Sequence, residues 1–206
     1  MPLTLSMETL GGLATPIVRR GIPLPAKRNQ QFTTTADDQK VVRIEIFLGE
    51  RPIANQNIRI GHVELTGLPD APRDGPQIDV LFDIDQTCTL TVTAKEKKTA
   101  NTKTSQLRVP PEHLTPEQIK VLLKAANDYK DKDTAQVRAI EAKNEAYALV
   151  HRAEKYLQNQ QRYSLGNATD QQIEEKLASL GLALQQDDIE PIKENTIHLG
   201  RLLPDA

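Results

Sequence analysis

Apolar and polar residues alternate along several short stretches in the first half of the chain. The alternation starts at residues 3–8, and a second pattern of this kind begins at Phe32 and runs to Arg51. Two further stretches, 78–84 and 90–94, repeat it. A period of two residues is typical of a strand with one buried face. Short alternating strands separated by turn residues such as Gly11-Gly12 predict an antiparallel β-sandwich.

The pattern changes near residue 110 from alternating to helical. Pro110-Pro111 cannot donate to a strand ladder, so the pair is expected to end the sheet region. Thr115-Pro116-Glu117-Gln118 then carries the signature of a capped helix start. A long helix is predicted over about 133–163 and a small bundle over about 168–203, both from helix-favouring composition and apolar spacing. Strands followed by helices predict an α+β fold.

The composition restricts the compartment of the protein. The chain of 206 residues has a formal net charge of −2, and Cys88 is its single cysteine, which excludes an intramolecular disulfide. Its N-terminus lacks a basic-then-apolar signal pattern, and no apolar run has the length of a membrane span. We therefore expect a soluble, cytoplasmic protein with no membrane partner.

The sequence offers little for catalysis or metal binding. Its four histidines are scattered, and a single cysteine gives no metal-ligand spacing. Neither GxxxxGK[ST] nor GxGxxG is present to hold a phosphate. Arg19-Arg20 and Lys27-Arg28 form basic pairs without interleaved aromatic residues, which favours a solvated rim over a nucleic-acid site. We expect no metal, no catalytic residue and no nucleic-acid partner.

Several motifs, taken in order, resemble the substrate-binding part of the seventy-kilodalton heat-shock chaperone family (DnaK-type). Within residues 2–109 they are PLTLSMETLGG, IPLPAKRNQQFTT, VRIEIFLGER, GLPDAPRDGPQIDVLFDID and LTVTAKEK. Two shorter matches, LTPEQI and AKNEAYALVHRAEKYL, follow before residue 163. The resemblance implies a peptide-binding antiparallel β-sandwich over 1–109 and a C-terminal α-helical lid and bundle over 110–206.

The resemblance also implies which residues hold an extended peptide. In the family the peptide lies between loops of the sandwich, with one side chain in a central pocket. The matching positions are Met7, Glu8, Thr9, Leu10, Phe32, Thr33, Thr35, Gln39, Val42, Ile44 and Ile78. From spacing alone, the apolar members of this set are ordinary core residues. Leu10 and Thr35 match the two residues that arch over the peptide, and Thr35 is more polar than the residue usual there.

Four further residues match the latch between lid and sandwich in the family. Asp37 and His151 match one pair of partners, and both residue types are kept. Arg73 matches a second latch residue, but Tyr147 occupies the position of its acidic partner, so stacking would replace an ion pair. We expect a latch that is weaker than usual and sensitive to protonation of the histidine.

The expected function is a chaperone module that binds extended hydrophobic segments of unfolded proteins. The family's ATPase domain is missing from the sequence, so we expect no enzyme activity and no cofactor, with ATP and Mg²⁺ acting only through such a domain. J-domain and nucleotide-exchange partners would likewise act through a full-length parent, and the sequence does not distinguish an excised piece from a free-standing protein. An interaction protein using the lid or basic rim, a regulator capturing a paralogue's tail, and self-association through Leu202-Leu203 remain alternatives.

Overall fold

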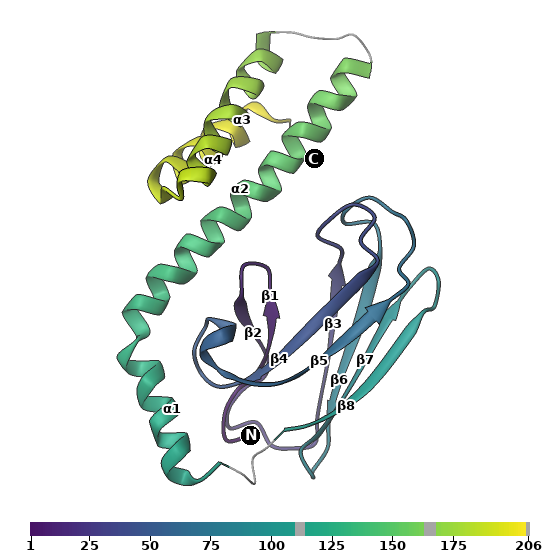
Figure 1. The fold of residues 1–206 in the computed structure, drawn as a ribbon, viewed down its shortest axis with the longest axis vertical. Helices are drawn as coiled ribbons and strands as arrows, with labels where there is room; N and C mark the ends of the chain where they lie inside the picture. Colours follow the sequence, from purple (N-terminus) through teal and green to yellow (C-terminus); the bar gives the residue numbers. More distant parts are fainter. Residues whose placement is uncertain (110–113, 163–167, 205–206) are drawn as a thin grey trace. The chain divides into compact units, whose positions relative to one another are not determined.

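The structure is a computed structural model that describes residues 1–109, 114–162 and 168–204. The chain divides into two compact units, residues 1–133 and 134–206. The first unit holds two antiparallel four-stranded sheets (Figure 1). One sheet has the order β2-β1-β4-β5, with strands Leu13–Val18, Leu5–Thr9, Val41–Leu48 and Ile58–Thr66. The other has the order β3-β6-β7-β8, with strands Ala26–Thr33, Gln77–Ile84, Thr89–Glu96 and Thr102–Arg108.

The inner faces of the two sheets enclose one apolar core. Ile44 and Ile46 of β4 and Val80 and Phe82 of β6 are all at most 4% exposed. Each side chain of this size contributes about 1.5–3 kcal/mol when it leaves water. The alternation along 42–48, 78–84 and 90–94 therefore predicted both the strands and their buried faces, and the α+β fold is confirmed.

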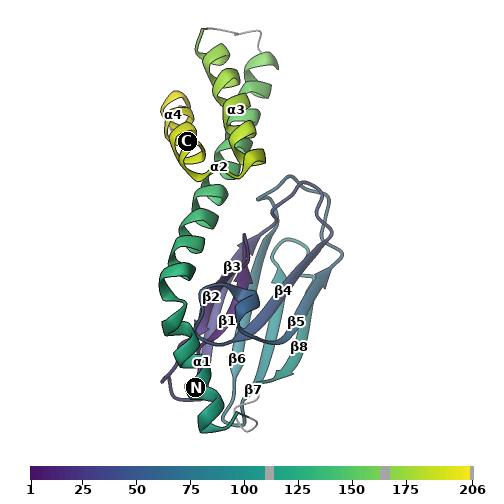
Figure 2. The ribbon, with the colours of Figure 1, turned by 60° about the vertical axis from the view of Figure 1, so that its left-hand side comes forward.

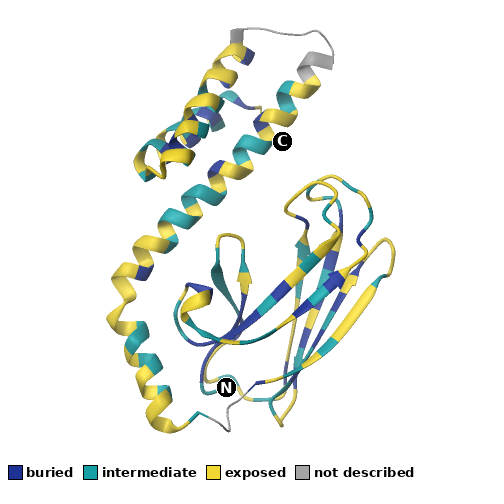
Figure 3. Ribbon diagram, viewed as in Figure 1, coloured by how far each residue is buried: buried dark blue, intermediate teal, exposed yellow. Residues whose placement is uncertain are grey.

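The strand predicted over 32–51 differs in the structure, and β5 was not predicted. The pattern assigned to 32–51 starts at Phe32, whereas in the structure Phe32 lies near the end of β3 and the next strand, β4, starts at Val41. Most residues of β3 are exposed (Figure 3), and within the described ranges β3 pairs with β6 alone, at the edge of its sheet. A polar edge strand carries no apolar alternation, so the sequence pattern does not show it.

The two sheets come close to one another where β5 lies beside β8 (Figure 2). A Cβ atom placed on Gly61 of β5 would lie 2.8 Å from Cδ2 of Leu107 of β8. Only a residue without a side chain leaves Leu107 in its present place. Gly61 thus allows Leu107 to pack directly on the backbone of β5.

Two hairpins without glycine are closed by carboxylates. In the β6–β7 turn, Oδ1 of Asp85 accepts from the backbone N–H of Thr87 (2.8 Å) and of Thr89 (3.0 Å). In the β7–β8 turn, Oε2 of Glu96 accepts from the backbone N–H (2.5 Å) and the hydroxyl (2.6 Å) of Thr99. Glu96 is fully buried, and the donors of Thr99 hold the pKa of its carboxyl below the usual range.

Helix α1 (Pro116–Asp128) starts as predicted and belongs to the first unit. Its capping box is complete, since Gln118 N–H donates to the hydroxyl of Thr115 (3.2 Å) and Thr115 N–H donates to Oε1 of Gln118 (2.9 Å). Ile119 and Leu122 pack against the sandwich core from this helix. The predicted break at Pro110-Pro111 lies outside the described residues.

The start of helix α2 (Lys130–Arg162) is fixed to the sandwich by an ion pair. Arg51, in the segment after β4, donates through Nε and Nη2 to the two oxygens of Asp133 at 2.8 and 2.6 Å. The guanidinium carbon also lies 4.5 Å from the ring centroid of Tyr129. The Asp133 side chain is 1% exposed and that of Arg51 is 14% exposed. Asp133 raises the pKa of Arg51 chiefly through these hydrogen bonds.

The second unit contains the rest of α2 with α3 (Ala168–Gln186) and α4 (Ile189–Leu202). Its own apolar core is built around Ala146, Ala153, Ile173, Leu180 and Leu199. Lys143 of α2 pairs with Asp187, the residue between α3 and α4. Among the helices described, none combines the length and the apolar character that crossing a membrane requires.

Candidate functional site

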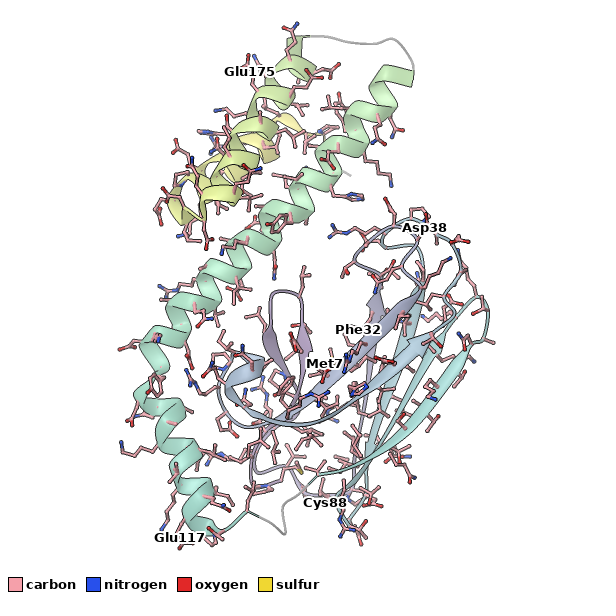
Figure 4. All side chains as sticks on the ribbon, in the orientation of Figure 1. Met7, Phe32, Asp38, Cys88, Glu117 and Glu175 are labelled. Carbon is pink, nitrogen blue, oxygen red and sulfur yellow. The ribbon has the colours of Figure 1, made fainter. Side chains whose placement is uncertain are left out.

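Five apolar residues predicted for a peptide pocket come together in the sandwich. They belong to four strands, β1, β3, β4 and β6, and therefore to both sheets. Met7, Ile44 and Ile78 are at most 4% exposed, whereas Phe32 and Val42 are half-buried and pack against the same core. Figure 4 labels Met7 and Phe32 within this region. The cluster thus has a sealed base and two members that still reach its surface.

The residues predicted for the rim are more exposed. Leu10 follows β1 and is 50% exposed, although it is a large apolar side chain. Glu8 and Thr33 are also exposed. The hydroxyl of Thr9 bonds to that of Thr15 at 2.9 Å, which ties the strands on both sides of the β1–β2 turn together. This turn therefore presents an apolar side chain on a hydrogen-bonded support.

The loop between β3 and β4 is held by the amide of Gln39. Its Oε1 accepts from the backbone N–H of Thr35 (2.9 Å) and from the Thr35 hydroxyl (3.3 Å). Its Nε2 donates to the carbonyl of Val41 at 2.8 Å. One side chain thus joins both ends of the loop and fixes Thr35, the second residue predicted to arch over a peptide.

Two of the four predicted latch residues lie together at the edge of this loop. Oδ1 of Asp37 accepts from the backbone N–H of Arg73 at 2.7 Å, and Asp74 N–H donates to the carbonyl of Thr34 at 3.2 Å. The guanidinium of Arg73 lies 3.6 Å from the carboxylate of Asp74. Figure 4 labels Asp38 in the same loop. Asp37 therefore holds the loop 70–75 against the loop between β3 and β4.

The other two predicted latch residues lie on α2 in the second compact unit. Tyr147 is 52% exposed, and His151, one turn further along the helix, is half-buried. Residues four apart share a helix face, so both side chains are presented together. Pairing of Asp37 with His151, and of Arg73 with Tyr147, stays a prediction.

Two features near the site were not predicted from the sequence. Arg51 and Asp133 are 82 residues apart in the chain, and neither has a local pattern that would indicate the pair. Glu96 lies opposite Ile78 in the ladder between β6 and β7, so a buried carboxylate stands next to the predicted base of the pocket. Within the described ranges, no three His, Cys, Asp or Glu side chains gather into a metal-binding group.

The structure combines a β-sandwich, an apolar core that includes the five predicted residues, two hydrogen-bonded loops, and helices that follow in the chain. A comparison with protein families matches residues 1–204 of the chain to the family described as "Hsp70 protein". The match extends over the sandwich and all four helices. The chain belongs to the Hsp70 family of chaperones.

Proposed function

We propose that the sandwich binds extended apolar segments of unfolded polypeptides between the β1–β2 turn and the loop from β3 to β4. Members of the Hsp70 family are chaperones that bind unfolded client polypeptides. The observation that supports this particular site is the cluster of Met7, Phe32, Val42, Ile44 and Ile78. Its two half-buried members, together with the exposed Leu10, offer apolar surface to one client side chain.

The expected free energies predict weak peptide binding with little sequence selectivity. A Leu-sized side chain placed against Phe32 and Val42 gains about 1.5–3 kcal/mol from burial. Pairing of the peptide main chain adds affinity with little discrimination, because every peptide has the same N–H and C=O groups. Ordering an extended segment costs about 1–2 kcal/mol per residue. We expect a Kd on the order of micromolar, which corresponds to about −8 kcal/mol.

In this proposal the chain binds peptides and does not catalyse a reaction. Hydrolysis of ATP, with Mg²⁺, belongs in this scheme to the ATPase domain that the family resemblance implies. J-domain and nucleotide-exchange partners would act through that domain, and the cytoplasm would be the compartment. Self-association through the same site would follow if an apolar segment of a second copy entered it.

The test is fluorescence anisotropy with a labelled Leu-rich heptapeptide. Val42→Phe should fill the space that the peptide side chain needs, whereas Val41→Phe makes the same change at a neighbouring residue that is 41% exposed. Micromolar binding by the wild type and Val41→Phe, and loss of binding in Val42→Phe, would support the site. The proposal is wrong if the folded wild type does not bind, or if both variants bind equally.

A further inference from the structure

A stretch of the chain around β3 has an unusual charge. Between Glu8 and Asp37 there is no acidic residue, although the whole chain has a formal net charge of −2. The same stretch contains Arg19, Arg20, Lys27 and Arg28. The first two lie in the loop after β2, and the other two lie in β3. We call these four residues with the outer edge of β3 the basic edge.

The cations of the basic edge are mostly left without carboxylate partners. Lys27 pairs with Asp83 at 2.6 Å, but Arg19, Arg20 and Arg28 form no ion pair with any residue that the structure describes. All four residues are exposed. Three of the four cations, Arg28 in β3 and Arg19 and Arg20 in the loop before it, therefore carry charge that no described carboxylate neutralises through an ion pair.

Two arginines of the other sheet behave differently. In the sheet of β4 and β5, Glu45 accepts from Arg59 at 2.7 Å and pairs with Arg43 at 2.8 Å. Arg59, followed by Arg43 and His62, lowers the pKa of the Glu45 carboxyl. Arg43 and Arg59 thus share a carboxylate on that sheet, whereas Arg19, Arg20 and Arg28 have none within ion-pair distance among the described residues.

The backbone of β3 is also open on one side. Its eight residues pair with β6 in an unbroken antiparallel register, from Ala26 opposite Ile84 to Thr33 opposite Gln77. β6 is its sole neighbour in the sheets of the described chain. In such a ladder, roughly half of the residues direct their N–H and C=O groups away from the partner strand. Without a bulge or proline in β3, the outward groups can accept a further strand.

One side chain of this edge, that of Arg28, contacts the backbone of β3. Nη1 of Arg28 donates to the carbonyl of Lys27 at 3.0 Å. A carbonyl oxygen has two lone pairs, so this bond leaves one acceptor site in place. The contact also keeps the guanidinium of Arg28 beside the backbone of β3, where a charged partner strand would lie.

We propose that the basic edge is a docking site for an extended acidic segment of a partner protein, which adds to the sheet as a ninth strand next to β3. Main-chain pairing supplies affinity in this mode of recognition, and side chains supply selectivity. Arg19, Arg20 and Arg28 select acidic residues in the added strand and speed its association. A second copy of this chain is a poor occupant, because two basic edges repel one another. This surface is separate from the apolar cluster, so the proposal does not depend on the proposed function.

The binding experiment uses the full chain and a labelled nonapeptide of alternating Glu and Thr. Anisotropy should show saturable binding that weakens as NaCl is raised, and hydrogen exchange of amides in 26–33 should slow when the peptide is bound. The same peptide N-methylated at every residue keeps its side-chain charges but has no main-chain N–H to donate on either edge, so it should not bind. Equal binding of the methylated peptide, or unchanged exchange in β3, would overturn the proposal.

Two double variants with the same net charge test whether the position of the charges matters. Arg19→Glu/Arg28→Glu should weaken binding of the peptide by about tenfold or more. Lys103→Glu/Lys120→Glu makes the same change in net charge at two exposed residues away from β3 and should bind like the wild type. Equal weakening by both pairs would overturn a local site, since it would show only a general charge effect.

Two further outcomes would also overturn the proposal. Tighter binding of a dT12 oligonucleotide than of the peptide would make the basic edge a site for polyanions. A dimer in sedimentation velocity that is abolished by Arg19→Glu/Arg28→Glu would make a second copy the occupant. Folding of each variant is checked by circular dichroism, and Val42→Phe should bind the acidic peptide like the wild type.

Discussion

The ion pair between Arg51 and Asp133 leads to the sharpest prediction for stability. We expect Asp133→Asn to destabilise the first compact unit by about 2 kcal/mol, because Arg51 would lose a charged and nearly buried partner. The two bonds of 2.8 and 2.6 Å join the segment after β4 to the first turn of α2. Their loss would release the start of this helix from the sandwich.

The magnitude follows from the environment of the two side chains. Removing one member of a buried pair typically costs about 3–5 kcal/mol. The Arg51 side chain is 14% exposed, and it also donates from Nη1 to Oε1 of Gln56 at 2.9 Å and stacks on Tyr129. These contacts remain in the variant, and Asn can still accept one hydrogen bond. The expected loss is therefore smaller than the usual range for a fully buried pair.

Urea unfolding followed by circular dichroism measures the effect. With an m-value of about 2 kcal/mol/M, the midpoint should fall by about 1 M. Asp131→Asn is the control, because Asp131 lies in the same first turn of α2 but is exposed. Both variants remove a favourable interaction with the helix dipole, worth about 0.3–1 kcal/mol. Equal losses in the two variants would refute the role of the pair.

A second comparison separates the pair from the packing around it. In Arg51→Met/Asp133→Leu the charges are replaced together by apolar side chains of similar size. Such replacements of buried pairs are often neutral or stabilising. We expect this double variant to be more stable than Asp133→Asn, and a lower stability would show that packing, not an unpaired charge, controls this contact.

Three other predictions follow from polar groups in the sandwich. Glu96→Gln should lower stability at pH 7 by about 1 kcal/mol, because the donors of Thr99 favour the charged carboxyl. This contribution to stability is complete above the ordinary pKa of about 4.3 and disappears as the pH falls through the lower pKa of the folded state. The melting temperature of the wild type should therefore fall more between about pH 5 and 3 than that of the variant. Gln30→Leu should raise stability in urea by about 1 kcal/mol, since Oε1 of Gln30 is buried without a hydrogen-bond partner among the described residues, and unchanged or lower stability would count against this reading. Gln39→Ala should speed dissociation of a bound heptapeptide about fivefold or more in stopped-flow measurements, because the loop at Thr35 loses its brace; equal rates would show that the loop does not hold the peptide.

Much of the fold was predictable because it depends on local patterns. Buried strands such as β6 show the alternation clearly, with Ile78, Val80, Phe82 and Ile84 on the core side and Leu81 as the one apolar residue on the opposite face. The start of α1 was equally clear, because the capping box of Thr115 and Gln118 is a local signal. Strand β3 was missed because it lies at an edge and buries little. Patterning detects burial, so it cannot detect a strand that is held mainly by its backbone.

The site could be predicted only in part. The spacing of Val42 and Ile44 indicated a buried face. The prediction that these residues line a peptide pocket, and not only an ordinary core, came from the family resemblance alone. The brace made by Gln39 depends on the path of the loop, and a glutamine in a polar stretch has no distinctive pattern. The pair of Arg51 and Asp133 forms across 82 residues of chain, a separation that no local pattern covers.

The contact between Gly61 and Leu107 also bears on the packing of the core. A Cβ atom at residue 61 would lie 2.8 Å from Cδ2 of Leu107, so any larger residue there requires the Leu107 side chain to move. Leu107 packs against the core that Met7, Val42 and Ile78 share between the two sheets. A substitution at Gly61 would therefore alter the packing of that core. Under the proposed function, it would change the fit of a peptide side chain from a position outside the binding site.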